Sequence, residues 1–544
     1  MILTISTFLL FTVLVAVLTW FITRGKSTST EEGFFLAGRS LTGVVIAGSL
    51  LLTNLSTEQL VGLNAGSFAE GLSVMAWEVI AGCSLVVLAL FFLPRYLKSG
   101  IATIPQFLEE RYDAKVRALT TGIFIIAYML ILLPFVLFSG ASALAYMLDL
   151  PTLLKLGDTA TIWVVVAFIA IVGSAYAIFG GLRAVAVSDT FNGLGLLIGG
   201  AMISWFSIQF AASDGQSITA VFKEIKVENP DAFVSLGKEG EDVHWPTLFT
   251  GVLILNFFYW CTNQQIIQRT FGAKNLAEGQ KGVLLAAFFK ILAPLILVLP
   301  GIVALHIANQ NPEFNAALLN ADGERDGTRV YGTLVRFVLP GALTGFFAAV
   351  VVGSILSTFN SVLNSSATLF SLGVYKKVIN RNATSEEVVK SGRLCSAIVA
   401  VCAAIGAPVI FLGQEGIFAF FQKLNGVYFI PLLGAILVGM FNKRVDGNSA
   451  FISIVVGLAI MIWGTFFSGD TIGNVFGSGY HFMGVVFVFL VVLQLVLGQK
   501  MKRSTPYVQA DAKVVDLTPW KPARLVGGIL VATVLIIYIL LAKG

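Results

Sequence analysis

Residues 41–66 read LTGVVIAGSLLLTNLSTEQLVGLNAG, an apolar segment interrupted in its middle by the polar run Thr53–Gln59. The next apolar segment begins near Leu72 and carries Glu78 in its interior. A charge in the middle of a bilayer costs at least ~3 kcal/mol on insertion scales, so it is rarely kept unless it is paired or lines a polar cavity. The interruption and the charge together predict a polar site inside a membrane.

The same pattern occurs a second time. An apolar segment from Thr247 passes through Asn256 into the polar run YWCTNQQ at Tyr259–Gln265, and the segment that begins near Val283 carries Lys290. Interrupted helices in corresponding positions of two halves are typical of the binding site of a secondary transporter.

The composition is that of a polytopic, all-α membrane protein. The chain has 544 residues, of which 57% are hydrophobic and only 12% are charged, and soluble globular domains are far more polar. Since about 20 apolar residues span the hydrocarbon core, we expect 14 transmembrane helices. They fall near 2–23, 41–66, 72–94, 118–147, 161–179, 187–211, 246–267, 282–306, 331–372, 391–411, 416–440, 447–467, 480–498 and 523–542.

Lysine and arginine predict the orientation. One set of alternate loops holds 25 of these residues, against 7 in the opposite loops and the C-terminal end. The first set is expected to be cytoplasmic, with both termini extracytoplasmic, in the inner membrane of a bacterium. The first segment lacks a basic n-region and a cleavage site, so we interpret it as a retained helix.

Other function classes find no support in the sequence. The four cysteines lie in apolar segments without CxxC spacing, and the three histidines are scattered, so no metal site is predicted from them. No GxxxxGKS phosphate loop is present, which disfavours ATP-driven pumping. The net charge of +5 follows from the loop bias and does not indicate nucleic-acid binding.

The helix pattern divides the chain into five parts. We expect an N-terminal helix and loop at 1–40, a five-helix half at 41–211, an extracytoplasmic loop at 212–245, a second five-helix half at 246–440 and three peripheral helices at 441–544. Because each half has an odd number of helices, the second half is inverted relative to the first.

Five polar residues are candidates for binding a solute, one on each of five predicted helices: Gln59, Glu78, Asn256, Lys290 and Gln422. Their carboxylate, ammonium and amide groups suit a neutral polyol, whose hydroxyls both donate and accept, and they also suit a zwitterion. The alternative is that Glu78 and Lys290 only pair with each other and join two helices.

A second candidate site is predicted for sodium. Ser354, Ser357 and Thr358 share one helix face. Their hydroxyls, together with carbonyls freed by the break at Leu52 to Leu55, make the uncharged oxygen cage that suits a hard cation. The alternative is that these hydroxyls bond back to their own helix.

Large apolar and aromatic residues near these sites are candidates for stacking on a ligand or closing a gate: Leu63, Trp77, Tyr259 and Phe418. In a chain with 12% aromatic residues, packing and the membrane interface are the alternative explanation.

The motifs resemble those of the solute:sodium symporter family, and most closely its sodium/galactose branch, which is related to the sodium/glucose cotransporters. The resemblance runs from about Glu32 to Arg444 and rests on FLAGRSLTGVVIAGSLLLTNLSTEQLVGLNAG, RYLKSGIATIPQFLEERYD, AIFGGLRAVAVSDT, NFFYWCTNQQIIQRTFGAKNLAEGQKG and SILSTFNSVLNSSATLFSLGVYKK. It implies a LeuT-like fold of two inverted five-helix repeats plus peripheral helices, and sodium as the coupling ion.

The resemblance also implies roles for individual residues. Sugar-binding positions of the branch match Gln59, Glu78, Asn256, Lys290 and Gln422, with Tyr259 as the inner gate and Leu63, Trp77 and Phe418 at the outer gate. Its sodium site matches the carbonyls of Leu52, Leu55 and Ser354 and the hydroxyls of Ser357 and Thr358, and its inner aspartate, a possible sodium exit, matches Asp189.

One sugar-contacting serine of the branch is Ala81 here, and Leu63 and Trp77 replace a methionine and a tyrosine at the outer gate, which leaves the identity of the sugar open. We therefore expect a sodium-coupled hexose symporter rather than an enzyme. The alternatives are a symporter of the same fold for an inositol, an organic anion or an amino acid, and a membrane sugar sensor that does not transport.

Overall fold

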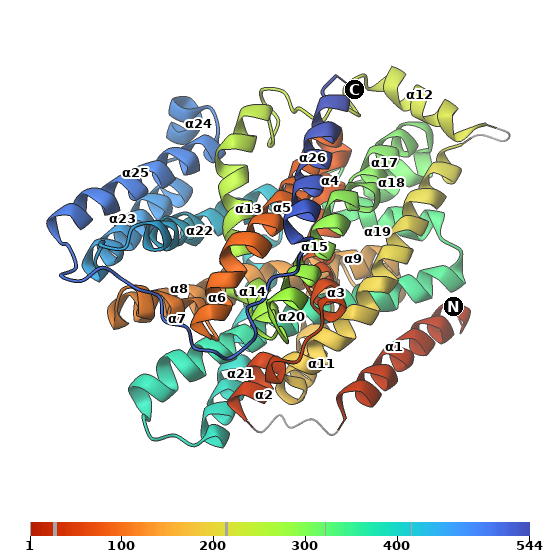
Figure 1. Ribbon diagram of the computed structural model, residues 1–544. Coiled ribbons are helices and arrows are strands. Elements are labelled where there is room, and N and C mark those ends of the chain that lie inside the picture. The colour runs from red at the N-terminus through yellow and green to blue at the C-terminus, as the bar shows by residue number, and fades with distance from the viewer. Residues whose placement is uncertain (1, 25–29, 213–215, 321, 415, 544) are drawn as a thin grey trace.

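The computed structural model describes residues 2–24, 30–212, 216–320, 322–414 and 416–543 (Figure 1). Its elements up to residue 211 are α1 (Ile2–Thr23), α2 (Glu31–Leu36), η1 (Ala37–Arg39), α3 (Gly43–Asn54), α4 (Thr57–Glu70), η2 (Gly71–Met75), α5 (Ala76–Val87), η3 (Leu88–Phe92), α6 (Leu93–Ser99), α7 (Ile104–Arg111), α8 (Ala114–Ala127), η4 (Tyr128–Leu132), α9 (Leu133–Met147), α10 (Leu150–Leu154) and α11 (Asp158–Ala211). The prediction of a helical protein is confirmed, because the β-structure of the described residues amounts to isolated bridges between residue pairs.

The second part of the chain is equally helical. Its elements are α12 (Ile218–Glu228), η5 (Trp245–Phe249), α13 (Gly251–Cys261), α14 (Gln264–Phe271), α15 (Leu276–Leu292), α16 (Pro294–Leu297), α17 (Leu299–Gln310), α18 (Pro312–Leu318), α19 (Gly327–Val338), α20 (Gly341–Phe370), η6 (Ser371–Ile379), α21 (Ser385–Phe411), α22 (Ile417–Phe441), α23 (Gly447–Phe466), α24 (Thr471–Phe476), α25 (Gly479–Lys500) and α26 (Ala523–Leu540).

Both polar interruptions are helix breaks. α3 ends at Asn54 and α4 begins at Thr57, whereas α13 ends at Cys261 and α14 begins at Gln264. The last carbonyls and the first N–H groups of a helix have no partner within it, so each break frees backbone polar groups in the interior of the protein.

The elements that carry the breaks lie in the middle of the bundle. α3 packs against α11 and α15, α5 packs against α13 and α15, and α20 packs along α11 and α21. Figure 1 shows α3, α14, α15 and α20 centrally, with α1 and α25 at the edges. Apolar side chains of the outer helices are exposed, for example Leu10 at 71%, as expected for surfaces that contact lipid.

The number of spanning helices differs from the prediction. Ten helices among the described residues are long and apolar enough to cross a membrane, or eleven if Leu276–Leu292 and Pro294–Gln310, which are bent by 46° at their junction, form one span. The expected count of 14 is therefore not confirmed. α3 and α13 are too short to count alone, because the breaks divide the segments to which they belong.

Two predicted boundaries are wrong. The loop expected at 179–188 is helical, since α11 continues from Asp158 to Ala211; its two adjacent glycines lower helix propensity without ending the helix. The single helix expected at 331–372 is divided into α19 and α20 by Leu339 and Pro340, because a proline disfavours helical backbone at the residue before it.

Both ends of the chain contact other elements of the bundle. Thr7 Oγ1 donates to the carbonyl of Ala342 at the start of α20, and the N–H of Ser235, in the segment that follows α12, donates to the carbonyl of Leu541. In the basic segment after α25, the N–H groups of Tyr507 and Ala512 bond to the carbonyls of Lys443 and Lys98. Three of the loops predicted to be cytoplasmic, those at Lys98, at Lys443 and after α25, therefore contact one another.

Candidate functional site

A small polar cavity lies between the two helix breaks. It is lined by residues of α3, α4, α5, α13 and α22, namely Asn54, Glu58, Gln59, Trp77, Glu78, Leu255, Asn256, Tyr259, Trp260, Phe421, Gln422 and Phe429. Five of the six predicted substrate residues are thus brought together. The sixth, Lys290, is outside this lining and contacts Glu78 from α15.

The volume of this cavity is about 30 Å³, close to the share of liquid volume that one water molecule takes. A hexose does not fit in it. In this conformation the cavity is therefore contracted, and a solute of that size enters only if one of the walls moves.

Glu78 and Lys290 form a buried ion pair at one wall of the cavity. Both side chains are 1% exposed, and Lys290 Nζ donates to Glu78 Oε2 and to Asn54 Oδ1. The ammonium also lies 5.5 Å from the ring centroid of Trp260. The pairing alternative considered from the sequence is thus realised here, with Asn54 of the α3 break as a third member that the sequence analysis did not name.

Two cavity-lining side chains keep polar atoms without a partner. Glu58 Oε2 and Gln59 Oε1 are buried and accept no hydrogen bond from any described residue. Most buried polar atoms in proteins have partners, so orphaned acceptors beside a cavity indicate a place for a ligand or for water. Glu58 belongs to the polar run of the first break, but the sequence analysis gave it no role.

The two remaining amides are held locally. Asn256 Nδ2 donates to the carbonyl of Val252 one turn earlier in α13, and Gln422 Oε1 accepts from Asn425 Nδ2 within α22. These bonds fix the orientation of both side chains without joining them to Glu78 or Lys290.

Tyr259 stands at the second break. Its hydroxyl accepts a hydrogen bond of 3.3 Å from Gln265 Nε2, and its ring centroid lies 6.4 Å from that of Phe429. Tyr128 holds the break itself, because its hydroxyl donates to Asn263 Oδ1 and accepts from the N–H of Gln265. Tyr128 was missed since it lies within an ordinary apolar segment.

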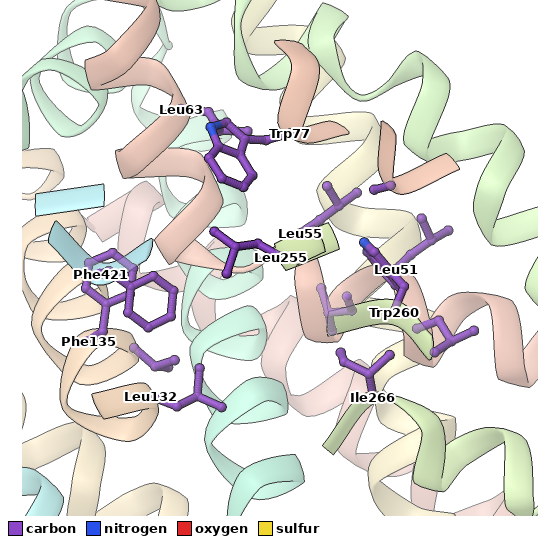
Figure 2. Packing of buried hydrophobic residues seen from close by; sticks show 14 of the residues in the cluster. Leu51, Leu55, Leu63, Trp77, Leu132, Phe135, Leu255, Trp260, Ile266 and Phe421 are labelled. Atoms are coloured by element: carbon purple, nitrogen blue, oxygen red, sulfur yellow. The ribbon is translucent and has the colours of Figure 1, made fainter. Parts of the chain in front are cut away.

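Aromatic side chains separate the small cavity from a much larger one. Trp77 lines both cavities, and its ring meets Phe418 and Tyr480 edge to face, each at 5.7 Å between centroids. Leu63 lines the large cavity, and Figure 2 shows it next to Trp77, above Leu255. The three predicted outer-gate residues therefore lie together at this boundary. Tyr480 lies there as well, although the sequence analysis did not name it.

The large cavity, which we call the vestibule, measures about 1110 Å³. Its charged lining comprises six carboxylates and two guanidinium groups: Glu70, Asp158, Asp242, Asp322, Glu324, Asp326, Arg325 and Arg329. A cleft with an excess of negative charge raises the local concentration of cations.

The predicted sodium residues lie where α20 faces the end of α3. Ser354 Oγ donates to the carbonyl of Leu55 across 3.2 Å, and Thr358 Oγ1 donates to the carbonyl of Thr53 across 2.9 Å. Ser357 Oγ is buried and makes no hydrogen bond of standard geometry. The hydroxyls of Ser354 and Thr358 thus reach across to the break rather than back along α20.

This oxygen cluster fits a hard cation, because it combines carbonyl and hydroxyl oxygens, with the Asp189 carboxylate beside Ser357. The structure adds one carbonyl to the predicted set. The carbonyl that accepts from Thr358 belongs to Thr53, which the sequence analysis did not name, and the role of the Leu52 carbonyl stays a prediction.

Asp189 lies in a buried polar network next to this cluster. Its Oδ2 accepts from Ser49 Oγ at 2.7 Å and lies 3.8 Å from Arg269 Nη2. Arg269 also donates to Ser49, to Ser361 and to the carbonyl of Gln265, and Ser361 Oγ donates to the carbonyl of Ser357. The network therefore connects Asp189 to a predicted sodium residue.

Arg269 corrects the sequence analysis, which counted it among the charges of a cytoplasmic loop. It is 1% exposed, and it belongs to α14, immediately after the second break. Its position four residues after the polar run Tyr259–Gln265 was the signal that could have identified it.

Comparisons with known proteins agree with this arrangement. A family model described as "Sodium:solute symporter family" matches residues 34–457. The chain is 42% identical over 534 residues to the uncharacterized symporter YidK of Escherichia coli (strain K12), covering 97% of this chain and 90% of that protein. It is 29% identical over 451 residues to the sodium/glucose cotransporter of Vibrio parahaemolyticus, covering 81% and 80%.

Among solved structures, the chain is similar to a Na⁺-coupled sialic acid symporter in a substrate-bound, outward-open state. The TM-score is 0.75 at 18% sequence identity, over 93% of this chain and 99% of that one. At this identity the likeness concerns the fold.

Proposed function

Because the chain belongs to the sodium:solute symporter family, we propose that it uses the inward flow of sodium to take up a neutral polyol, with a hexose such as galactose or glucose as the leading candidate. Family membership makes it a membrane transporter coupled to sodium, not an enzyme. The choice of solute is the part that we propose.

One observation carries this proposal: consecutive residues of a single helix break face the two sites. The carbonyl of Thr53 accepts from Thr358 in the hydroxyl cluster, and the side chain of Asn54 accepts from Lys290 beside the solute cavity. An ion bound at the hydroxyl cluster would therefore act on the same stretch of backbone that positions Asn54 beside the solute cavity.

For the ion, the break at the end of α3 supplies carbonyl oxygens and α20 supplies hydroxyl oxygens. A sodium ion between them would draw α20 toward α3, since both sets of oxygens bind one cation. The Ser357 hydroxyl, which makes no hydrogen bond of standard geometry and lies beside Asp189, would gain an ion contact.

When the solute binds, hydrogen bonds within the protein would be replaced by hydrogen bonds between the protein and the solute. Hydroxyls of a polyol would take hydrogen bonds from Lys290 and give them to Glu78, Glu58 and Gln59, while the Trp77 and Phe418 rings move apart to enlarge the cavity. The orphaned acceptors Glu58 Oε2 and Gln59 Oε1 favour a ligand rich in donors. A hexose supplies such donors without a charge of its own.

The sodium gradient is sufficient for accumulation. One charge moving through roughly 100–150 mV releases about 2.3–3.5 kcal/mol, and a tenfold concentration gradient adds about 1.4 kcal/mol. About 4–5 kcal/mol per sodium ion corresponds to a solute gradient on the order of a thousandfold.

The orientation and the internal symmetry belong to the same proposal. With the basic loops cytoplasmic, the acidic vestibule opens outward, where sodium is abundant. The halves 41–211 and 246–440 would then be inverted repeats, and their broken helices would meet at the solute cavity.

Counterflow of labelled galactose and glucose in proteoliposomes, with sodium or with choline, tests the proposed function. We expect exchange of one hexose only in sodium. A panel containing an inositol, an amino acid and an organic anion discriminates the alternatives, and exchange of a charged solute without either hexose would overturn the choice of a polyol.

A further inference from the structure

Two histidines from distant parts of the chain meet beside the vestibule. His244 precedes η5, and His481 lies in the first turn of α25. Their Nε2 atoms are 3.3 Å apart, and the two rings are nearly perpendicular, at 88° with centroids 5.1 Å apart. Both side chains are partly exposed.

One arrangement of the hydrogen bonds of Thr250 selects the tautomer of His481 that leaves Nε2 without a proton. Thr250 Oγ1 donates to the carbonyl of Thr247 at 3.3 Å and lies 3.1 Å from His481 Nδ1. Because its own proton is used, Thr250 accepts from Nδ1–H of the neutral imidazole. The lone pair of His481 is thereby left on Nε2, which faces His244, in the manner of the outer contacts that orient metal-binding histidines.

The spacing of the two nitrogens fits one metal ion. Zinc–nitrogen bonds of about 2.0–2.1 Å at the tetrahedral angle place two ligand nitrogens roughly 3.3 Å apart. Imidazole suits zinc, copper and nickel. We propose that His244 and His481 form an extracytoplasmic site for zinc or a similar transition metal, with water completing the coordination.

No larger set of ligands surrounds the pair. Within the part of the chain that the structure describes, no group of three or more His, Cys, Asp or Glu side chains is arranged to hold a metal. The proposed site therefore has two protein ligands and open positions, unlike the four-ligand sites that hold structural zinc.

A metal here would tie together elements next to the gate. His244 and η5 lead directly into α13, which carries Asn256 and Tyr259. Tyr480, adjacent to His481, packs on Trp77 and lines the vestibule. A metal bound by both histidines would keep α13 and Tyr480 in their present relative positions. We therefore expect the bound metal to slow transport.

Zinc titration of the purified protein, carrying an affinity tag without histidine and stripped of metal, tests the site by calorimetry near pH 7.5. We expect one zinc ion per chain, and at least tenfold weaker binding in His244→Ala and in His481→Ala. The control is His306→Gln, which changes the third histidine of the chain, buried against Glu228, and it should bind zinc like the wild type.

A direct N–H···N hydrogen bond between the rings is the competing explanation of the 3.3 Å distance. It predicts no saturable zinc binding at micromolar concentrations, or binding that both single variants retain, and either result would overturn the proposal. Thermal unfolding without metal verifies that the variants fold. This inference does not depend on the identity of the solute, because its readout is metal binding.

Discussion

The hydroxyl of Thr358 lies 2.9 Å from the carbonyl oxygen of Thr53 and donates to it, which joins the middle of α20 to the last turn of α3. The next residue, Asn54, bonds to Lys290 on α15. The candidate ion site and the candidate solute site therefore share the end of one broken helix, α3.

Removing hydroxyls from the ion cluster should weaken sodium binding. We expect Thr358→Ala or Ser357→Ala to raise the sodium concentration for half-maximal uptake about twofold to tenfold, the equivalent of one hydrogen bond of about 0.5–1.5 kcal/mol. Solute selectivity should not change. Thr358→Ser keeps the hydroxyl and is the matched control; unaltered sodium dependence in the double alanine variant would refute the assignment.

A double-mutant cycle on Glu78 and Lys290 separates a solute role from helix pairing. Each single change, Glu78→Gln or Lys290→Met, should destabilise the protein because it strands a buried charge, which costs about 3–5 kcal/mol. The double variant should recover most of the thermal stability yet lose solute uptake.

If the double variant transports like the wild type, the pair serves only to join α5 and α15. The control is the exposed pair of Glu386 and Lys390, whose side chains are 76% and 67% exposed. Removing both charges there should leave stability and uptake nearly unchanged, since water screens exposed pairs.

Tyr259 should act mainly through its ring. Its hydroxyl makes a long hydrogen bond of 3.3 Å to Gln265, so Tyr259→Phe is expected to retain much of the uptake rate. Tyr259→Ala removes the aromatic face beside the cavity and should lose most of it. Initial rates in proteoliposomes measure both, and normal transport by the alanine variant would show that the ring is not a gate.

Arg269 should be required for folding rather than for selectivity. Arg269→Ala leaves Asp189 buried without its cation, so we expect a lower melting temperature, the equivalent of a loss of about 3–5 kcal/mol. Combining it with Asp189→Asn should restore part of that loss. Equal melting temperatures of the single and double variants would exclude an ion pair of this kind.

The polar interruptions were predictable from the sequence because each is a run of polar residues inside an apolar segment. Gln59, Glu78, Asn256 and Gln422 line the cavity because these runs and lone charges cannot face lipid. Their roles in binding stay predictions.

Features that depend on tertiary contacts were not predictable. Arg269 resembles a loop arginine in the sequence, and only the buried partners Asp189, Ser49 and Ser361 give it a place in the core. The continuity of α11 and the division at Pro340 depend on local backbone preferences that hydropathy does not measure. The meeting of His244 and His481 required knowing that α25 packs against α13.

The most direct test of the central claim is equilibrium binding of the solute identified by counterflow to the purified protein, in sodium and in choline. If the α3 break couples the two sites, sodium should tighten solute binding at least tenfold, and the Ser354→Ala/Thr358→Ala variant should bind equally weakly in both salts. Equal affinity of the wild-type protein in sodium and in choline would contradict the account.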